Sequence, residues 1–88
     1  MAMMSTGKAD ERIALILMLL SESYGRQSED GNEIQIPLTR QDVAEMAGTT
    51  VESSIRTMSR WQKKGVIKSD HMIVTILDDD ALFAHLKS

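Results

Sequence analysis

The sequence predicts an α+β fold of three main helices, a small antiparallel sheet and a short C-terminal helix. Three observations support this prediction. Two short helical patterns flank a break, AGTT, at residues 47–50. Two short apolar runs separated by turn residues follow at 66–77. The chain has 88 residues, enough for one domain. A helix-turn-helix followed by a two-stranded hairpin is the winged helix-turn-helix arrangement.

The first helix is predicted over residues 9–24, ADERIALILMLLSESY. Apolar residues recur there at helical spacing and form one face: Ile13, Ile16, Leu17, Leu20 and Tyr24. A second apolar strip is made by Leu15, Met18 and Leu19. A helix that is apolar nearly all round needs partners on two sides. Either it lies centrally in the domain, or the second strip meets a second subunit or a domain outside this chain.

A capping signal marks the second helix. Residues 25–33, GRQSEDGNE, have the composition of a loop, and a short strand is predicted at 34–38, with Pro37 ending it. Thr39 followed three residues later by Asp42 approximates a capping box, which predicts a helix start. Gly48 is the expected C-cap. The predicted buried face of this helix is Val43, Met46 and Ala47.

The third helix is predicted from a cap at Thr49 or Thr50 to about Lys64, with Gly65 ending it. Strands at 66–68 and 73–77 then flank a tight turn at 69–72. The last segment, DDDALFAHLKS, has acids at its start and Lys87 near its end, which suits a helix macrodipole.

The third helix separates a core side from a cationic side. Advancing 100° per residue places on the core side Val51, Ser54, Ile55, Met58 and Trp61. The opposite strip holds Glu52, Ser53, Arg56, Arg60, Lys63 and Lys64. A solvated surface is the usual role of such residues. Here the charge is local, because residues 50–68 carry five Lys or Arg and one acid in a chain of formal net charge −3. Attraction to phosphate depends on the field within about 10 Å.

Glu52 and Arg56 have the chemistry to read bases. Arginine can bind O6 and N7 of guanine together, and a carboxylate can accept from N4 of cytosine. The two residues lie four apart on the N-terminal half of the helix, the part that enters a major groove. The same spacing also simply stabilises a helix. We favour DNA contact because the preceding turn projects this helix outward.

The stretch LTRQDVAEMAGTTVESSIR resembles the DNA-binding domain of the Crp–Fnr family of bacterial transcription regulators. That domain commonly shows I-x-L-P-L-T-R-Q-D-L-A, a small-Gly turn, T-x-E-T-x-x-R and G-[LI]-I. These correspond here to IQIPLTRQDVA, AGTT, TVESSIR and GVI. The start R-I-A of the family's first helix corresponds to residues 12–14, and the resemblance covers roughly residues 9–86.

The resemblance implies roles for individual residues. Glu52 and Arg56 correspond to the glutamate and arginine that read bases, and Ser53 to a position that touches base or phosphate. The start of the first motif helix, which meets the DNA backbone, corresponds to Thr39, Arg40 and Gln41. We expect further backbone contacts from Thr50, Arg60 and Lys63.

Some positions depart from the family pattern. The family often has an apolar residue where Ser54 stands and a small one where Ile55 stands, so Ile55 either packs inward or meets a thymine methyl. Val51 replaces a base-reading arginine of some members, which points to an Fnr-like branch. The wing turn at 69–72 lacks the usual Gly-Arg or Gly-Lys. His71 is the one candidate donor there, and we expect it to be simply exposed.

The resemblance also implies an organisation. Such regulators normally have an N-terminal effector-binding β-barrel and a long dimerisation helix. Residues 1–8 are expected to be a mobile leader or hinge, with the hinge at Thr6-Gly7, and residues 9–88 the DNA-binding domain. A homodimer is expected to bind a pseudo-palindromic operator in double-stranded DNA and to contact or block RNA polymerase. The alternative is a winged-helix protein-interaction or dimerisation module, with the basic strip solvated or facing an acidic partner.

No enzymatic activity and no cofactor are predicted. The absence of cysteine excludes thiolate metal sites and fits a cytoplasmic protein. The longest apolar run, residues 13–20, is far shorter than the about twenty residues of a membrane span. His71 and His85 lack metal-ligand spacing, and Ser53 and Ser54 lack a His–acid partnership. Residues 78–80, three aspartates, are expected to point apart and to cap the last helix.

Overall fold

The computed structural model describes the backbone of residues 2–87 and the side chains of residues 9–86. Its helices are α1 (Ala2–Tyr24), α2 (Arg40–Ala47), α3 (Val51–Lys63) and α4 (Asp79–Lys87). Its strands are β1 (Gly25–Gln27), β2 (Asn32–Ile34), β3 (Ile67–Asp70) and β4 (Ile73–Ile76). The strands form one antiparallel sheet in the order β1-β2-β4-β3. The predicted α+β arrangement, a helix-turn-helix followed by a hairpin, is confirmed, with one strand more than predicted.

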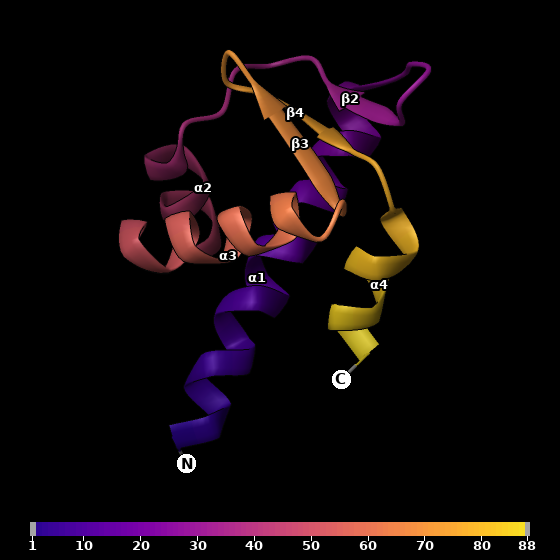
Figure 1. The fold of residues 1–88 in the computed structure, drawn as a ribbon. Helices are drawn as coiled ribbons and strands as arrows, with labels where there is room; N and C mark the ends of the chain where they lie inside the picture. Colours follow the sequence, from indigo (N-terminus) through magenta and orange to yellow (C-terminus); the bar gives the residue numbers. More distant parts are fainter. Residues whose placement is uncertain (1, 88) are drawn as a thin grey trace.

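The helix α1 is the central element of the fold. It contacts the other three helices and the strands β1 and β2, and Figure 1 shows α3 crossing over it with α4 at its side. Ile13 and Leu17 are fully buried, and Trp61 of α3 and Val74 of β4 belong to the same core. The predicted apolar face is therefore correct at its centre. Its last member is wrong, because Tyr24 at the end of the helix is 48% exposed.

The second apolar strip of α1 remains at the surface. Leu15 and Leu19 are exposed, and Met18 is half-buried. The helix α1 is thus central in the domain, but the rest of the domain does not bury this second strip. It begins at Ala2, seven residues before the expected start, so the segment expected to be a leader is helical along its described part. The hinge at Thr6-Gly7 falls inside the helix and stays a prediction.

Both predicted caps of α2 and the predicted N-cap of α3 are confirmed. The Thr39 hydroxyl accepts from the backbone N–H of Asp42, and the Asp42 carboxylate accepts from the backbone N–H of Thr39, each at 3.0 Å. Gly48 ends α2 in the left-handed conformation at φ 69°, which a glycine adopts without steric cost. Thr50 caps α3 by accepting from the backbone N–H of Ser53. The C-cap of α3 is Lys64, and the expected Gly65 comes one residue later, at φ 75°.

The strand predicted at 34–38 is misplaced. Ladder pairing covers residues 32–34, and the segment before it, expected to be a loop, forms the additional strand β1. The turn between them contacts β4 closely: a Cβ added at Gly31 would lie 2.1 Å from the carbonyl oxygen of Ile76. Beyond β2 the chain bends at residues 35–36 and leaves the ladder, and the side chains of Ile34 and Leu38 are buried. The alternation of apolar residues therefore predicts burial correctly and strand pairing incorrectly.

The wing is the hairpin of β3 and β4. Its strands are shifted slightly from the predicted 66–68 and 73–77, because Asp70 pairs with Ile73 and leaves a two-residue turn. The turn residues His71 and Met72 both have positive φ, 52° and 68°. This is the geometry that the right-handed twist of a hairpin favours, normally with Asn or Gly at these positions.

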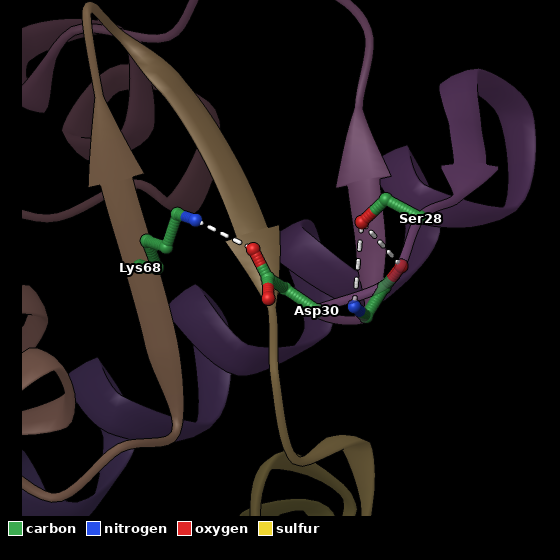
Figure 2. A network of polar contacts seen from close by, with 4 residues as sticks. Ser28, Asp30 and Lys68 are labelled. Atoms are coloured by element: carbon green, nitrogen blue, oxygen red, sulfur yellow. Dashed lines mark hydrogen bonds and ion pairs between the residues drawn. The ribbon is translucent and has the colours of Figure 1, made fainter.

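A polar contact ties the β1–β2 turn to the wing. Figure 2 shows the Asp30 carboxylate reaching the Lys68 Nζ on β3 at 2.7 Å, beside the Ser28 hydroxyl that closes the turn onto Gly31. The hydrogen bond from Lys68 to Asp30, followed by the charge attraction between them, raises the pKa of Lys68 above its ordinary value of 10.5. The contact reaches across β4 and links the β1–β2 turn to β3, the strand at the opposite edge of the sheet.

Candidate nucleic-acid interface

The buried face of α3 is rotated relative to the predicted face. Ser54, Met58 and Trp61 are buried as predicted, but Val51 and Ile55 are 36% and 47% exposed. Thr57 is buried in their place. The centre of the buried face is therefore turned about the helix axis by roughly 50° from its predicted position, since successive residues of a helix lie 100° apart. The two side chains assigned to the core lie instead beside the cationic strip.

A carboxylate of α1 explains this rotation. Asp10 accepts a hydrogen bond from the Thr57 hydroxyl at 2.7 Å and an ion-paired one from Arg60 Nη2 at 2.5 Å. Close by on α1, Arg12 Nη1 donates to the Gly48 carbonyl at 3.2 Å, in the turn between α2 and α3. These two α1 residues hold the helix-turn-helix against the first helix.

Sequence reasoning missed Asp10 as a positioning residue. Asp10, Ile13 and Leu17 fall at i, i+3 and i+7, so the carboxylate continues the buried stripe of α1. An acid on an apolar face signals a partner, because a buried charge without one is costly. That signal was present in the sequence.

Glu52 and Arg56 are both exposed on the outward side of α3. Together with Ile55 they line a shallow open hollow of about 550 Å³. No ion pair joins them to each other or to any other residue in the part of the chain that the structure describes. The structure thus presents a carboxylate and a guanidinium with their hydrogen-bonding groups available to a ligand.

The local positive charge is smaller than the sequence count indicates. Of the five basic residues between 50 and 68, Arg60 is paired with Asp10 and Lys68 with Asp30. Arg56, Lys63 and Lys64 remain as exposed cations without an ion pair among the described residues. The unneutralised charge is therefore concentrated on α3 and just beyond its end.

The remaining predicted contact residues cluster at the starts of α2 and α3. Thr39 and Gln41 are exposed, and Gln41 Nε2 donates to Glu45 at 2.9 Å. Arg40 is half-buried and lies with Nη2 3.5 Å from Gln62 Oε1 on α3. The Thr50 hydroxyl donates to the Ser53 hydroxyl at 3.1 Å. Their roles toward DNA stay predictions.

The wing tip carries an acid as well as a histidine. The His71 side chain is 94% exposed, as expected, and its Nδ1 lies 2.9 Å from Asp70 Oδ1. Behind the tip, the outer face of the sheet also bears Glu33 and Lys68 around a hollow of about 340 Å³. The negative charges here weaken the attraction of the wing tip for phosphate.

The three aspartates at the start of α4, Asp78 just before it and Asp79 and Asp80 in its first turn, do not point apart as expected. Their carboxylate oxygens can lie within 4.8 Å of one another, although all three residues are exposed. Asp78 Oδ1 accepts from the backbone N–H of Ala81 at 3.2 Å, so the predicted capping role is confirmed. The start of the helix curves these consecutive residues toward one side.

None of the described helices is long and apolar enough to span a membrane.

Comparison with known proteins assigns the sequence to a family. Residues 11–84 match the model of the Crp-like helix-turn-helix domain. The chain is 32% identical over 84 residues to the transcriptional activator protein FnrA of Stutzerimonas stutzeri, covering 96% of this chain and 34% of that protein. It is 31% identical over 80 residues to the fumarate and nitrate reduction regulatory protein of Escherichia coli K12, covering 91% and 32%. The chain thus spans about a third of the length of these relatives.

Solved structures share the fold. The CO-dependent transcription factor CooA from Carboxydothermus hydrogenoformans superposes with a TM-score of 0.81 at 20% identity, covering 89% of this chain and 36% of that one. A transcriptional regulator of the CRP family from Thermus thermophilus gives 0.80 at 21% identity, covering 91% and 40%. Because the family model covers most of the chain and the fold agrees, this chain belongs to the family of Crp-like helix-turn-helix domains, which serve DNA-binding transcription regulators.

Proposed function

We propose that this chain binds double-stranded DNA in a sequence-specific manner, with α3 in a major groove. One observation carries the proposal: Glu52 and Arg56 are exposed on the outward face of α3 and have no ion-pair partner among the described residues. Arg56 can donate to a guanine and Glu52 can accept from a cytosine. The opposite face of α3 is buried against the core, which supports the choice of this face for the groove.

Phosphate contacts would position the helix. Lys63 is exposed at the end of α3, and the N-cap Thr50 stands at its start. At the start of α2 the proposed backbone contacts are Thr39, Arg40 and Gln41. Helix N-termini favour phosphate, because their first N–H groups point outward. Arg60 belongs to the proposed set as well: the contact with Asp10 uses its Nη2, and its side chain is 41% exposed, so further donors of the guanidinium can reach a phosphate.

The larger assembly follows from the same readout. As part of a homodimer, two copies of the domain would read the halves of a pseudo-palindromic operator. Bound there, the regulator would contact RNA polymerase or block it, in the cytoplasm. We expect DNA binding by residues 9–88 to need no cofactor of its own.

A selection of bound sequences from random duplex DNA tests the proposal. The selected duplex and its single-base-pair variants are then titrated by fluorescence anisotropy at about 50 and 200 mM salt. The wild-type chain should prefer the selected sequence. Arg56→Ala should lose about 1–3 kcal/mol of preference at one base pair. Lys63→Ala should weaken binding equally on all duplexes and reduce the salt slope by about 1.

Arg26→Ala is the matched control. Arg26 is an exposed arginine on β1 at the far edge of the sheet, so its loss should leave sequence preference unchanged. Equal effects of the two arginine variants would contradict the assigned role of Arg56. If the wild-type chain shows no sequence preference at either salt concentration, the alternative of a winged-helix protein-interaction module is favoured.

A further inference from the structure

The exposed face of α3 carries an apolar ridge beside its polar one. Val51 and Ile55 lie four residues apart, so their side chains are neighbours along the helix. Ile55 is 47% exposed, and it shares a shallow hollow with Glu52 and Arg56. The face proposed to enter the groove therefore has two parallel rows, one of charged and one of aliphatic side chains.

The fold gives no reason for these two residues. Neither side chain joins the buried core, whose α3 members are Met58 and Trp61. β-Branched residues are also poorer helix formers than alanine, lysine or glutamate, which an exposed helix position normally favours. An isolated exposed aliphatic residue is ordinary. Two adjacent ones, within the row that flanks Glu52 and Arg56, call for an apolar ligand at that place.

The edges of base pairs in a major groove offer one apolar group, the C5-methyl of thymine. We propose that Val51 and Ile55 form a thymine-methyl contact surface, so that the domain reads A·T pairs next to the pairs read by Glu52 and Arg56. The inference rests on the proposed function, because it requires α3 in the groove. Ile55 is the principal residue, since it lies between Glu52 and Arg56 along the chain and lines the same hollow.

Replacing single thymines by deoxyuridine tests this directly, because the change removes the methyl group and leaves every hydrogen-bonding group in place. In the selected duplex, deoxyuridine at one or two thymines should weaken wild-type binding about fourfold each, equal to the ~0.8 kcal/mol of one buried carbon group. Ile55→Ala should bind the thymine duplex more weakly by a similar factor. At the base pair that Ile55 contacts, this variant should bind the duplex with thymine and the duplex with deoxyuridine equally well. Val51→Ala should lose the same discrimination at the neighbouring base pair, which Val51 contacts.

Leu19→Ala is the control for loss of an exposed aliphatic side chain, since Leu19 lies on α1 and is 49% exposed. It should retain the full sensitivity to deoxyuridine. Undiminished sensitivity in both Ile55→Ala and Val51→Ala would overturn the inference. So would wild-type binding that ignores every deoxyuridine while Arg56→Ala still loses specificity, and in that case the proposed function stands. Failure of the wild-type chain to select any sequence would overturn both.

Discussion

Replacing Asp10 by alanine tests how α3 is held. The carboxylate accepts from the Thr57 hydroxyl at 2.7 Å and from Arg60 Nη2 at 2.5 Å, both on α3. Both contacts are lost in Asp10→Ala, while the apolar residues of the interface between α1 and α3 stay in place. The variant should therefore fold and be less stable than the wild type.

The two contacts contribute unequally to the free energy of unfolding. Thr57 is 4% exposed, and a buried hydroxyl that loses its partner costs about 1–3 kcal/mol. Part of this is recovered if the hydroxyl turns to the carbonyl four residues earlier in the helix. The Arg60 side chain is 41% exposed, so water screens the ion pair and its loss costs about 0.2–1 kcal/mol. We expect a total of ~2 kcal/mol, or a fall in Tm of about 8–16 °C for a domain of this size.

Urea unfolding followed by tryptophan fluorescence measures this loss, because Trp61 is the single tryptophan of the sequence and is 1% exposed. Thr57→Val removes the hydroxyl and preserves the shape of the side chain. In a double-mutant cycle, Asp10→Ala should cost clearly less in the Thr57→Val background than in the wild type. Glu22→Ala, an exposed acid on the same helix, should change stability by less than about 0.5 kcal/mol.

Two results would refute this reasoning. The first is an Asp10→Ala midpoint no lower than that of Glu22→Ala, which would show that water replaces the carboxylate without cost. The second is strict additivity of Asp10→Ala and Thr57→Val, which would show that the stability resides in the Arg60 ion pair or in helix propensity.

Three further changes have definite expected outcomes. Thr39→Ala removes the capping box of α2 and should cost about 1 kcal/mol in urea unfolding, whereas Thr49→Ala should cost less; equal losses would contradict the capping role. Met72→Gly removes the side chain of a left-handed residue in the wing turn and should raise the free energy of unfolding. The net gain is about 0.5–1 kcal/mol, because the greater freedom of glycine in the unfolded chain offsets part of the relieved strain. A decrease in the free energy of unfolding would show that Met72 is unstrained at φ 68°. The folded pKa of Lys68 is raised by Asp30, so the pair stabilises the fold below about pH 10.5 and ceases to do so as pH rises through the folded value. Urea midpoints of wild type and Asp30→Asn should therefore converge at high pH, and a constant gap would assign the effect to another cause.

The helix ends could be predicted because their signals are local. The Thr39–Asp42 box and the Gly48 cap are each decided by residues within four positions of one another. Thr50 differs only in that two adjacent threonines offered the same cap, and the chain uses the second. Such motifs need no knowledge of the rest of the fold, so the sequence specifies them almost completely.

The buried face of α3 could not be obtained from apolarity alone. The prediction took aliphatic side chains for the core and turned the helix toward Val51 and Ile55. In the structure Thr57 is buried because its hydroxyl finds an acceptor 47 positions earlier, at Asp10. A polar residue becomes a core residue when a distant side chain satisfies it, and that pairing is invisible in a local helical wheel.

The same limit applies to β1 and to Met46. Residues 25–27 have loop composition and form a strand because β2 pairs with them and the turn is fastened to Lys68. Met46 is predicted on the buried face of α2, yet it is 43% exposed and Ala44 is buried instead. The small side chain suits the close contact of α2 with its neighbours, and Met46 lies at a hollow that Leu15 also lines. Packing partners decided each of these positions.

The two sides of α3 are therefore built for different purposes. On the buried side, Met58, Trp61 and the Asp10 contact supply stability. On the exposed side, Ile55 lies outside the buried core and is a poorer helix former than alanine, so a change to alanine should leave stability unchanged or slightly higher. If the same change weakens DNA binding, the two measurements move in different directions, which a purely structural role for Ile55 would not produce. Loss of stability in Ile55→Ala would instead mean that the residue supports the fold, and the case for its contact with thymine would fall with it.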